Sequence, residues 1–299
     1  MNLTIIKNKT ISFTDKVQHF YDELRAIFVD DNHTLVSIGQ TVYEIINDTN
    51  ITILGTAKKS IKSIDSNKIL LGYASYDGTV SLFTKTTAKL EFFDIIEGPT
   101  TEIKQVFIND NFIILATRGQ MVWILNIVHL DNMSFQITIN KIIEDHMQDI
   151  KGAKIINHQL YSWSYDNTIR IYNYLFEEWE LDQVINCNSI VWNVHFINDT
   201  LIAVTNESIQ IYRKKNGQFF FLNQLYLSIT ECNPSLEFTL NNQKFLILTC
   251  NITVICILNS QLEIIVTYNM SFSITSLFYY DHKLYVGSNN SLHIFTIVS

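Results

Sequence analysis

The chain has 299 residues, of which 47% are hydrophobic and 17% are charged, and its formal net charge at pH 7 is −8. This length exceeds the usual size of one domain by roughly two-fold, a departure that all-β barrels and propellers commonly show. The acidic balance and the lack of a basic stripe argue against direct binding to nucleic acid.

The amino terminus and the cysteines indicate a compartment. Met1–Lys7 lacks the apolar block and the small-residue cleavage site of a secretory signal, and no apolar run approaches the roughly 18 residues of a membrane span. Cys187, Cys232, Cys250 and Cys256 include no Cys-x-x-Cys pair and no clustered His, so neither a disulfide framework nor a zinc site is expected. We therefore expect a reduced, cytoplasmic or nuclear protein that does not bind membranes.

Alternating strand patterns recur along the chain as pairs of strands joined by short turns. The pattern is clearest where Asp77-Gly78 gives a strong hairpin signal, and it returns around Asp166. In chain order the predicted strand pairs are Thr34–Ile38 with Val42–Ile45, Lys68–Ala74 with Thr79–Phe83, Phe112–Thr117 with Met121–Leu125, Gln159–Ser164 with Thr168–Tyr172, Leu201–Thr205 with Ser208–Tyr212, Phe245–Thr249 with Val254–Ile257, and Lys283–Gly287 with Ser291–Phe295.

The spacing of these pairs predicts the fold. Equivalent points in successive pairs lie 38 to 47 residues apart, which straddles the period of about 40 to 45 residues in WD-repeat blades. A further strand precedes several pairs, as at Ile103–Ile108 and Val191–Phe196, so each unit has three inner strands and a variable outer one. We predict an all-β protein, a single seven-bladed WD-repeat β-propeller spanning residues 1–299.

The last unit lacks an outer strand of its own, because the chain reaches Ser299 first. We predict that Leu3–Ile6 supplies this strand by pairing with the last blade. An N-terminal strand that closes the last blade would leave only short, protected edges.

His146, Asp166 and either Ser162 or Ser164 have the residue types of a hydrolytic triad. In a WD-repeat blade, however, a His before the first strand, a Ser in the second and an Asp in the turn form a hydrogen-bond network that holds the turn. We interpret these residues as that structural network, and Asp77 as the equivalent turn residue of the second blade.

No other pattern points to catalysis or to a cofactor. The eight His residues have no metal-ligand spacing, and there is no Gly-rich phosphate loop. A propeller enzyme would need clustered acids, His residues or metal ligands, and the sequence has no such cluster. We expect neither a bound metal nor a cofactor.

About half of the chain, from Gly72 to Asn216, carries a more specific resemblance. The residues that carry it are Ser75–Phe83, Ile96–Gly98 leading to Glu102–Lys104, Arg118 ahead of Val122-Trp123, Asp145–Lys151, Ser164–Tyr172, Glu178–Glu180 and Val191-Trp192. In their order and in the links between blades they resemble the WD-repeat subunit of the cytosolic iron-sulfur protein assembly (CIA) targeting complex. The chain departs from this family where Pro99 replaces the His of a Gly-His pair, where Gly119 replaces a turn Asp, and where Phe83, Leu125, Tyr172 and Tyr212 replace Trp.

The resemblance implies a non-enzymatic adaptor. Such a subunit docks a small cysteine-bearing assembly adaptor and a large helical-repeat scaffold protein, and it helps to present apo iron-sulfur client proteins. Arg118 looks like the exposed arginine of the family's partner surface, and a planar guanidinium can bind a carboxylate at two points. A solvated loop arginine is the alternative. Trp192 is either a surface anchor or part of the blade packing.

A second hypothesis is a WD-repeat interaction subunit of another multiprotein complex, such as a ubiquitin ligase receptor or a coat complex. Those subunits more often carry helical or motif-bearing extensions outside the propeller, and the sequence shows essentially none.

Overall fold

The computed structural model describes residues 3–14, 16, 22–47, 50–86, 89–130, 134–227 and 234–298, and its regular elements are β-strands. These strands form seven four-stranded sheets, and in six of them the strands follow one another in chain order. The seven predicted blades are therefore confirmed, and each contains an outer strand. Among the described residues, no helix has the length and apolarity needed to span a membrane.

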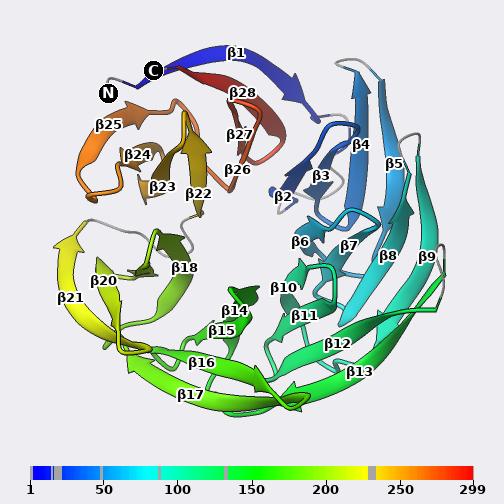
Figure 1. The fold of residues 1–299 in the computed structure, drawn as a ribbon. Coiled ribbons are helices and arrows are strands. Elements are labelled where there is room, and N and C mark those ends of the chain that lie inside the picture. Colours follow the sequence, from blue (N-terminus) through cyan, green and yellow to red (C-terminus); the bar gives the residue numbers. More distant parts are fainter. Residues whose placement is uncertain are drawn as a thin grey trace. The chain divides into compact units, whose positions relative to one another are not determined.

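The chain divides into two compact units, of which unit 2 comprises Ala57–Trp192. Unit 2 holds three complete sheets (Figure 1). The turns at Asp77 and Asp166, where the sequence pattern is clearest, both lie in this unit. Its strands are β6 (Ile61–Ser66), β7 (Leu70–Ser75), β8 (Thr79–Lys85), β9 (Leu90–Glu97), β10 (Ile103–Ile108), β11 (Phe112–Thr117), β12 (Val122–His129), β13 (Phe135–Ile143), β14 (Ile150–Ile156), β15 (Gln159–Ser164), β16 (Thr168–Leu175) and β17 (Glu178–Asn186).

Unit 1 comprises Met1–Thr56 and Asn193–Ser299 and holds the other four sheets, apart from the first two residues of β18. Its strands are β1 (Thr4–Ser12), β2 (Leu24–Val29), β3 (Thr34–Ile38), β4 (Thr41–Asn47), β5 (Asn50–Thr56), β18 (Val191–Ile197), β19 (Thr200–Thr205), β20 (Ser208–Lys215), β21 (Gln218–Tyr226), β22 (Ser235–Leu240), β23 (Gln243–Asn251), β24 (Val254–Leu258), β25 (Ile264–Asn269), β26 (Ser276–Tyr280), β27 (Lys283–Gly287) and β28 (Ser291–Val298). That residues 1–299 form one domain stays a prediction.

The N-terminal strand closes the last blade. In unit 1, β1 pairs antiparallel with β28, from Thr4 opposite Val298 to Ser12 opposite Ser291. Figure 1 shows the two strands side by side, β1 in blue and β28 in red. The predicted closure is confirmed, and the pairing extends well beyond the predicted Leu3–Ile6.

Burial separates the inner strands from the outer ones. All six residues of β7 are buried, whereas six of the nine residues of β17 are exposed. Inner strands pack on both faces and therefore read as continuous apolar runs, while outer strands face water. In unit 2 one core cluster joins Leu70 and Leu82 to Val106 and Leu115, which belong to the next blade.

Side chains tie neighbouring inner strands together. A carboxylate oxygen of Asp65 on β6 accepts a hydrogen bond of 2.7 Å from the main-chain N–H of Ile108 on β10. The side-chain oxygen of Gln105 accepts one of 3.0 Å from Ala153 on β14. Burial raises the pKa of Asp65 to about 7, against the smaller opposing effects of its hydrogen bonds and of Lys85.

The cysteines differ from the expectation of unbridged thiols. Cys250 on β23 and Cys256 on β24 form a disulfide across one hairpin of unit 1. A hairpin brings residues on its two strands together whatever their spacing in the sequence, and this pair lacks the Cys-x-x-Cys spacing on which the expectation rested. Cys187 is free and buried, and Cys232 lies outside the described residues.

Candidate functional site

The structure brings together the residues with triad-like chemistry. His146 precedes β14, Ser162 lies on β15, and Asp166 lies in the turn between β15 and β16. Nδ1 of His146 is 2.8 Å from a carboxylate oxygen of Asp166, and Nε2 is 2.8 Å from Oγ of Ser162. Because a carboxylate only accepts, Nδ1 of His146 carries a proton and donates it in the hydrogen bond to Asp166.

Burial decides what this arrangement does. Ser162 is 0% exposed and His146 is 2% exposed, so a substrate cannot reach the hydroxyl. Asp166 also accepts from the main-chain N–H groups of Met147 at 2.9 Å and Thr168 at 3.0 Å. Burial alone would raise the pKa of Asp166, but the hydrogen bonds from His146, Thr168 and Met147 outweigh it and hold the pKa well below its usual range. His146 thus links the Asp166 turn to Ser162 on strand β15 by hydrogen bonds, which is a structural arrangement.

Serine hydroxyls complete the turn in two blades. Ser164 donates to the carbonyl of Asp149 at 2.9 Å and accepts from the N–H of Asp166 at 3.0 Å. In the second blade, Ser75 donates to the carbonyl of Lys59 at 3.0 Å and accepts from the N–H of Asp77 at 3.2 Å. The same local hydrogen bonds therefore form in both blades.

Asp77 differs from Asp166 in its partners. Its carboxylate accepts from the main-chain N–H of Lys58 at 2.8 Å and from that of Thr79 at 3.0 Å, without a His. Burial would raise the pKa of Asp77, but its hydrogen bonds to Thr79, Lys58 and Ser75 lower it overall. The next residue, Gly78, has φ +88°, and a Cβ there would lie 2.5 Å from the carbonyl oxygen of Pro99.

Arg118 lies in the turn between β11 and β12, with 57% of its side chain exposed. Nη1 is 3.2 Å from a carboxylate oxygen of Glu102, and Nε is 3.4 Å from a carboxylate oxygen of Asp149. The main-chain N–H of Arg118 also donates to the carbonyl of Glu102 at 2.8 Å. The guanidinium is thus exposed yet held between carboxylates that precede two neighbouring inner strands.

Three lysines occupy one repeated position in successive blades of unit 2. Strands β6, β10 and β14 each pair with the strand that follows them, β7, β11 and β15. Near the start of each of these first strands, one residue is skipped in the pairing. The skipped residues are Lys62, Lys104 and Lys151. A β-bulge redirects a side chain locally, and here the same irregularity places a lysine in each of three successive blades.

Aromatic rings and carboxylates hold these lysines. The ammonium groups of Lys62 and Lys104 lie 4.7 and 4.6 Å from the ring centre of Tyr76. Lys104 also pairs with Glu102 at 3.2 Å. Burial would raise the pKa of Glu102, but the hydrogen bond and charge of Lys104, together with Arg118, lower it.

These contacts join into one chain across three blades of unit 2. We call it the Arg118 network, and its members are Lys62, Tyr76, Glu102, Lys104, Arg118 and Asp149. Sequence reasoning found Arg118 and missed the lysines. The available signal was a lysine or arginine at the second position of the first strand in each of the first four units.

Trp192, at the start of β18, packs against the preceding blade, β14–β17. It is 8% exposed, and its ring lies 4.3 Å from the ammonium group of Lys151 and 5.5 Å from the ring of Tyr165. Its carbonyl accepts from the indole N–H of Trp163 at 3.1 Å. The structure therefore agrees with the packing alternative, and little of the indole is presented to a partner.

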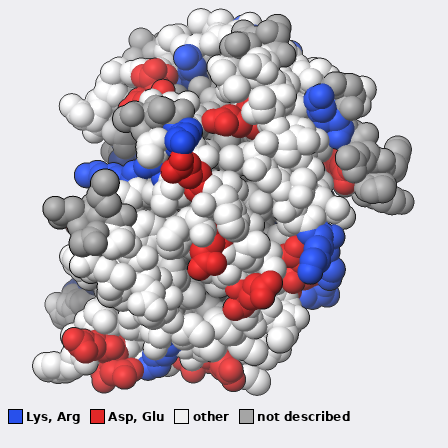
Figure 2. All heavy atoms as spheres, turned by 90° about the vertical axis from the view of Figure 1, so that its right-hand side faces the viewer, with Lys and Arg blue, Asp and Glu red and all other residues white. Residues whose placement is uncertain are grey.

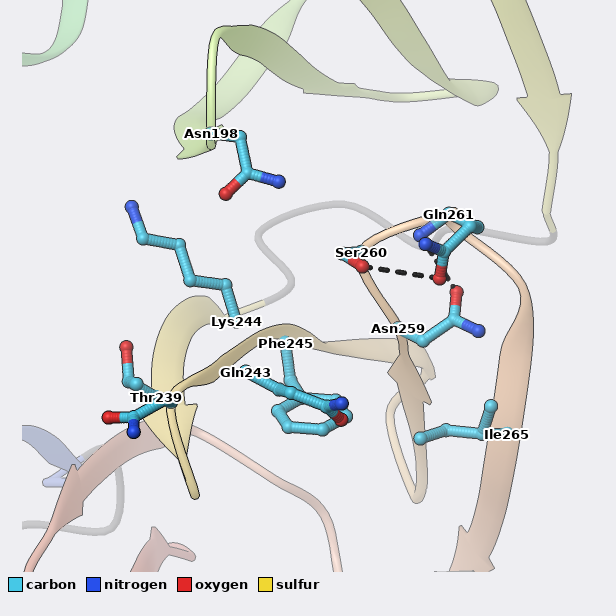
Figure 3. Close-up of a pocket in the computed structure, with 10 residues that line it drawn as sticks. Asn198, Thr239, Gln243, Lys244, Phe245, Asn259, Ser260, Gln261 and Ile265 are labelled. Carbon is cyan, nitrogen blue, oxygen red and sulfur yellow. Dashed lines mark hydrogen bonds between the residues drawn. The ribbon is translucent and has the colours of Figure 1, made fainter. Parts of the chain in front are cut away.

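Unit 1 contains a polar pocket of about 520 Å³ at the turns that follow β18, β22 and β24. Figure 3 shows Asn198 and Lys244 on one side of it and Ser260 with Gln261 on the other, above Phe245. Its described lining contains Lys244 as the ionisable group, together with side-chain amides and hydroxyls. Such a lining can exchange hydrogen bonds with a polar ligand but provides no acid–base pair.

Charge elsewhere is dispersed. Figure 2 shows one face on which basic and acidic side chains are scattered in small groups among wide uncharged areas. Among the described residues, no group of three or more His, Cys, Asp or Glu side chains could hold a metal ion.

Comparisons with known proteins identify the fold. No protein-family model and no curated protein matches the chain. Among solved structures, the chain is similar to the WD40 β-propeller domain of Doa1, with a TM-score of 0.71 and 14% sequence identity over 98% of this chain and 97% of that one. At this identity the likeness shows the fold alone, which is that of a seven-bladed WD40 β-propeller.

Proposed function

We propose that this protein is a non-catalytic adaptor that binds partner proteins through the Arg118 network. WD40 propellers generally serve as interaction scaffolds, so the fold supports an adaptor role and does not name the partner. The observation that carries the proposal is the exposed guanidinium of Arg118 between Glu102 and Asp149.

The energetics of these ion pairs suit exchange with a partner. Exposed ion pairs contribute only about 0 to 1 kcal/mol, so an incoming carboxylate can replace Asp149, which is 3.4 Å from Nε of Arg118, at little cost. A planar guanidinium binds such a group at two points. Lys62 and Lys104 add positive charge to the same network, and their contacts with Tyr76 hold them in place before a partner arrives.

The finer proposal is an adaptor of cytosolic iron-sulfur protein assembly that helps deliver clusters to apo-proteins through protein–protein contacts. Its support is the resemblance of Gly72–Asn216, within which Arg118 stands at the family's spacing to Val122-Trp123. The partners would be a small cysteine-bearing adaptor, a helical-repeat scaffold and apo iron-sulfur clients, in the cytoplasm or the nucleus. The clusters would be cargo, held by the partners.

The test compares partners recovered with tagged wild-type protein and with two charge reversals. Arg118→Glu places a third carboxylate beside Glu102 and Asp149, while Lys283→Glu reverses an exposed charge on β27 of unit 1 and serves as the matched control. We expect wild type and Lys283→Glu to recover a small cysteine-bearing protein with a helical-repeat scaffold. Arg118→Glu should lose both while keeping the wild-type circular dichroism spectrum.

Two results would overturn parts of the proposal. Full recovery of the same partners by Arg118→Glu would remove the Arg118 network from the function. Recovery of ubiquitin-ligase or coat-complex subunits in place of iron-sulfur assembly proteins would refute the finer assignment and keep the adaptor class.

A further inference from the structure

The outer strand β21 of unit 1 exposes an unusual amount of apolar surface. It is the last strand of its sheet and pairs with β20 on one side. Phe220, Phe221, Leu222 and Tyr226 are each between 51% and 71% exposed. An edge strand presents main-chain N–H and C=O groups along its open side, and exposed apolar side chains beside them favour pairing with another strand.

Several of the other outer strands carry charges that oppose such pairing. The outer strand β17 contains Glu178, Glu180 and Asp182, and β13 contains Lys141. By contrast, β21 reads QFFFLNQLY and has no charged residue in nine. Charged residues on an edge are a common protection against strand addition, and β21 lacks them, as do the outer strands β5 and β25. β21 differs from β5 and β25 in having four large apolar side chains that are each more than half exposed.

The strand that pairs with β21 supplies positive charge. β20 ends in Arg213, Lys214 and Lys215, all exposed, and Arg213 lies opposite Phe220. The hairpin 208–226 contains no Asp or Glu. Asp199 lies at the same end of the sheet, beside the Thr200 that pairs with Arg213. Its single negative charge offsets only part of the positive charge of Arg213, Lys214 and Lys215, although the net charge of the whole chain is −8.

We propose that β21 is a docking edge for an extended acidic peptide segment of a partner protein, which adds to the sheet as a fifth strand. Main-chain hydrogen bonds along the open edge would supply affinity, as in other cases of strand addition. Apolar side chains of the peptide would pack on Phe220, Leu222 and Tyr226. Its carboxylates would pair with the cations at the end of β20.

The chemistry of the hairpin favours this occupant over two others. A second copy of the chain, pairing through the same strand, would supply no carboxylate to Arg213, Lys214 and Lys215, because the hairpin 208–226 contains no Asp or Glu. A lipid surface would call for apolar residues at the hairpin tip, but the tip is Asn216-Gly217 next to cations. The exposed apolar residues instead extend from Phe220 to Tyr226, about 20 Å along the strand.

Binding of a labelled peptide to the full-length protein tests the proposal. The probe is a fluorescein-labelled ten-residue peptide of alternating Glu and Val, measured by fluorescence anisotropy, and a peptide with Lys in place of Glu is its charge control. We expect the Glu peptide to bind and the Lys peptide not to bind. Changing Arg213, Lys214 and Lys215 to Gln should weaken binding about tenfold at low salt, since each exposed charge contact contributes modestly.

The apolar contact has its own matched variants. Phe220→Ser with Leu222→Ser should weaken binding, whereas Ile139→Ser, which removes an equally exposed apolar side chain from β13, should leave binding unchanged. Hydrogen exchange should show that the peptide protects amides of 218–226. Arg118→Glu should bind the Glu peptide as wild type does, so failure here is distinct from failure of the proposed function.

Three outcomes would overturn the docking edge. They are equal binding of the Glu and Lys peptides, exchange protection confined to residues outside 218–226, and binding to phosphatidylserine vesicles that the Glu peptide does not compete with. The last result would assign the hairpin to a lipid surface instead.

Discussion

Replacing Asp166 with alanine removes the acceptor on which the turn between β15 and β16 depends. The carboxylate accepts from Nδ1 of His146 at 2.8 Å, from the N–H of Met147 at 2.9 Å, and from both the N–H and the hydroxyl of Thr168, at 3.0 and 2.6 Å. The imidazole of His146 is buried, so its N–H would have no water to replace the lost oxygen. The turn groups of Met147 and Thr168 can recruit solvent.

These contacts set the size of the effect. Loss of a hydrogen bond to a charged group costs about 1.5 to 3 kcal/mol, and the buried His146 contact belongs at the upper end. With roughly 1 kcal/mol for the turn contacts, Asp166→Ala should lower the free energy of unfolding by about 3 to 4 kcal/mol, a large value for one substitution. In a chain of this size, that corresponds to a fall in melting temperature of roughly 5 to 6 °C.

The matched control is Asp77→Ala, which removes the same turn acceptor where no His is bound. It should cost about 1 to 2 kcal/mol, roughly half of the Asp166 effect. Urea denaturation followed by circular dichroism measures both variants. Equal losses for the two, or a loss below about 1 kcal/mol for Asp166→Ala, would refute the role given to His146.

The pH dependence gives a second readout. Hydrogen bonding holds the pKa of Asp166 below its value in the unfolded chain, so its contribution to stability is present above that unfolded value and is lost as the pH falls. The difference in stability between wild type and Asp166→Ala should shrink as the pH falls below about 4.

Deleting residues 1–8 removes most of the strand that closes the last blade and should lower the melting temperature by roughly 10 °C, since it exposes buried apolar side chains; an unchanged melting curve would mean that closure adds nothing. The pKa of Asp65 is raised from 3.8 to about 7 by burial, so its carboxylate destabilises the fold increasingly across that range. Asp65→Asn keeps a hydrogen-bond acceptor, and its melting temperature should rise relative to that of wild type as the pH rises from 4 to 8. A difference in melting temperature that does not change with pH would contradict this. Gly78→Ala and Gly217→Ala impose similar positive φ strain, but only at Gly78 does a Cβ meet a main-chain atom, the carbonyl oxygen of Pro99 at 2.5 Å. In urea titrations Gly78→Ala should cost at least about 1 kcal/mol more, and equal costs would disprove the contact.

The sequence by itself determined the strands, the turns and the number of blades. Strand Gln159–Ser164 and the Asp166 turn follow from alternation over a few residues and from turn chemistry, both of which are local. Repetition of that local pattern at a nearly constant period predicted seven units. The closing strand was predicted from the number of strands in each unit, because one unit lacked its fourth strand and an apolar stretch lay at the other end of the chain.

Only the tertiary structure decided which side chains meet. Arg118 is held by Glu102 and Asp149, which lie in segments before two different inner strands, and periodicity within a strand contains no information on such contacts. The burial of Trp192 beneath Lys151 likewise depends on how one blade packs on the next. The disulfide of Cys250 depends on hairpin register. Alternation sets the face a residue occupies, whereas partners separated by a whole blade are chosen by packing between sheets.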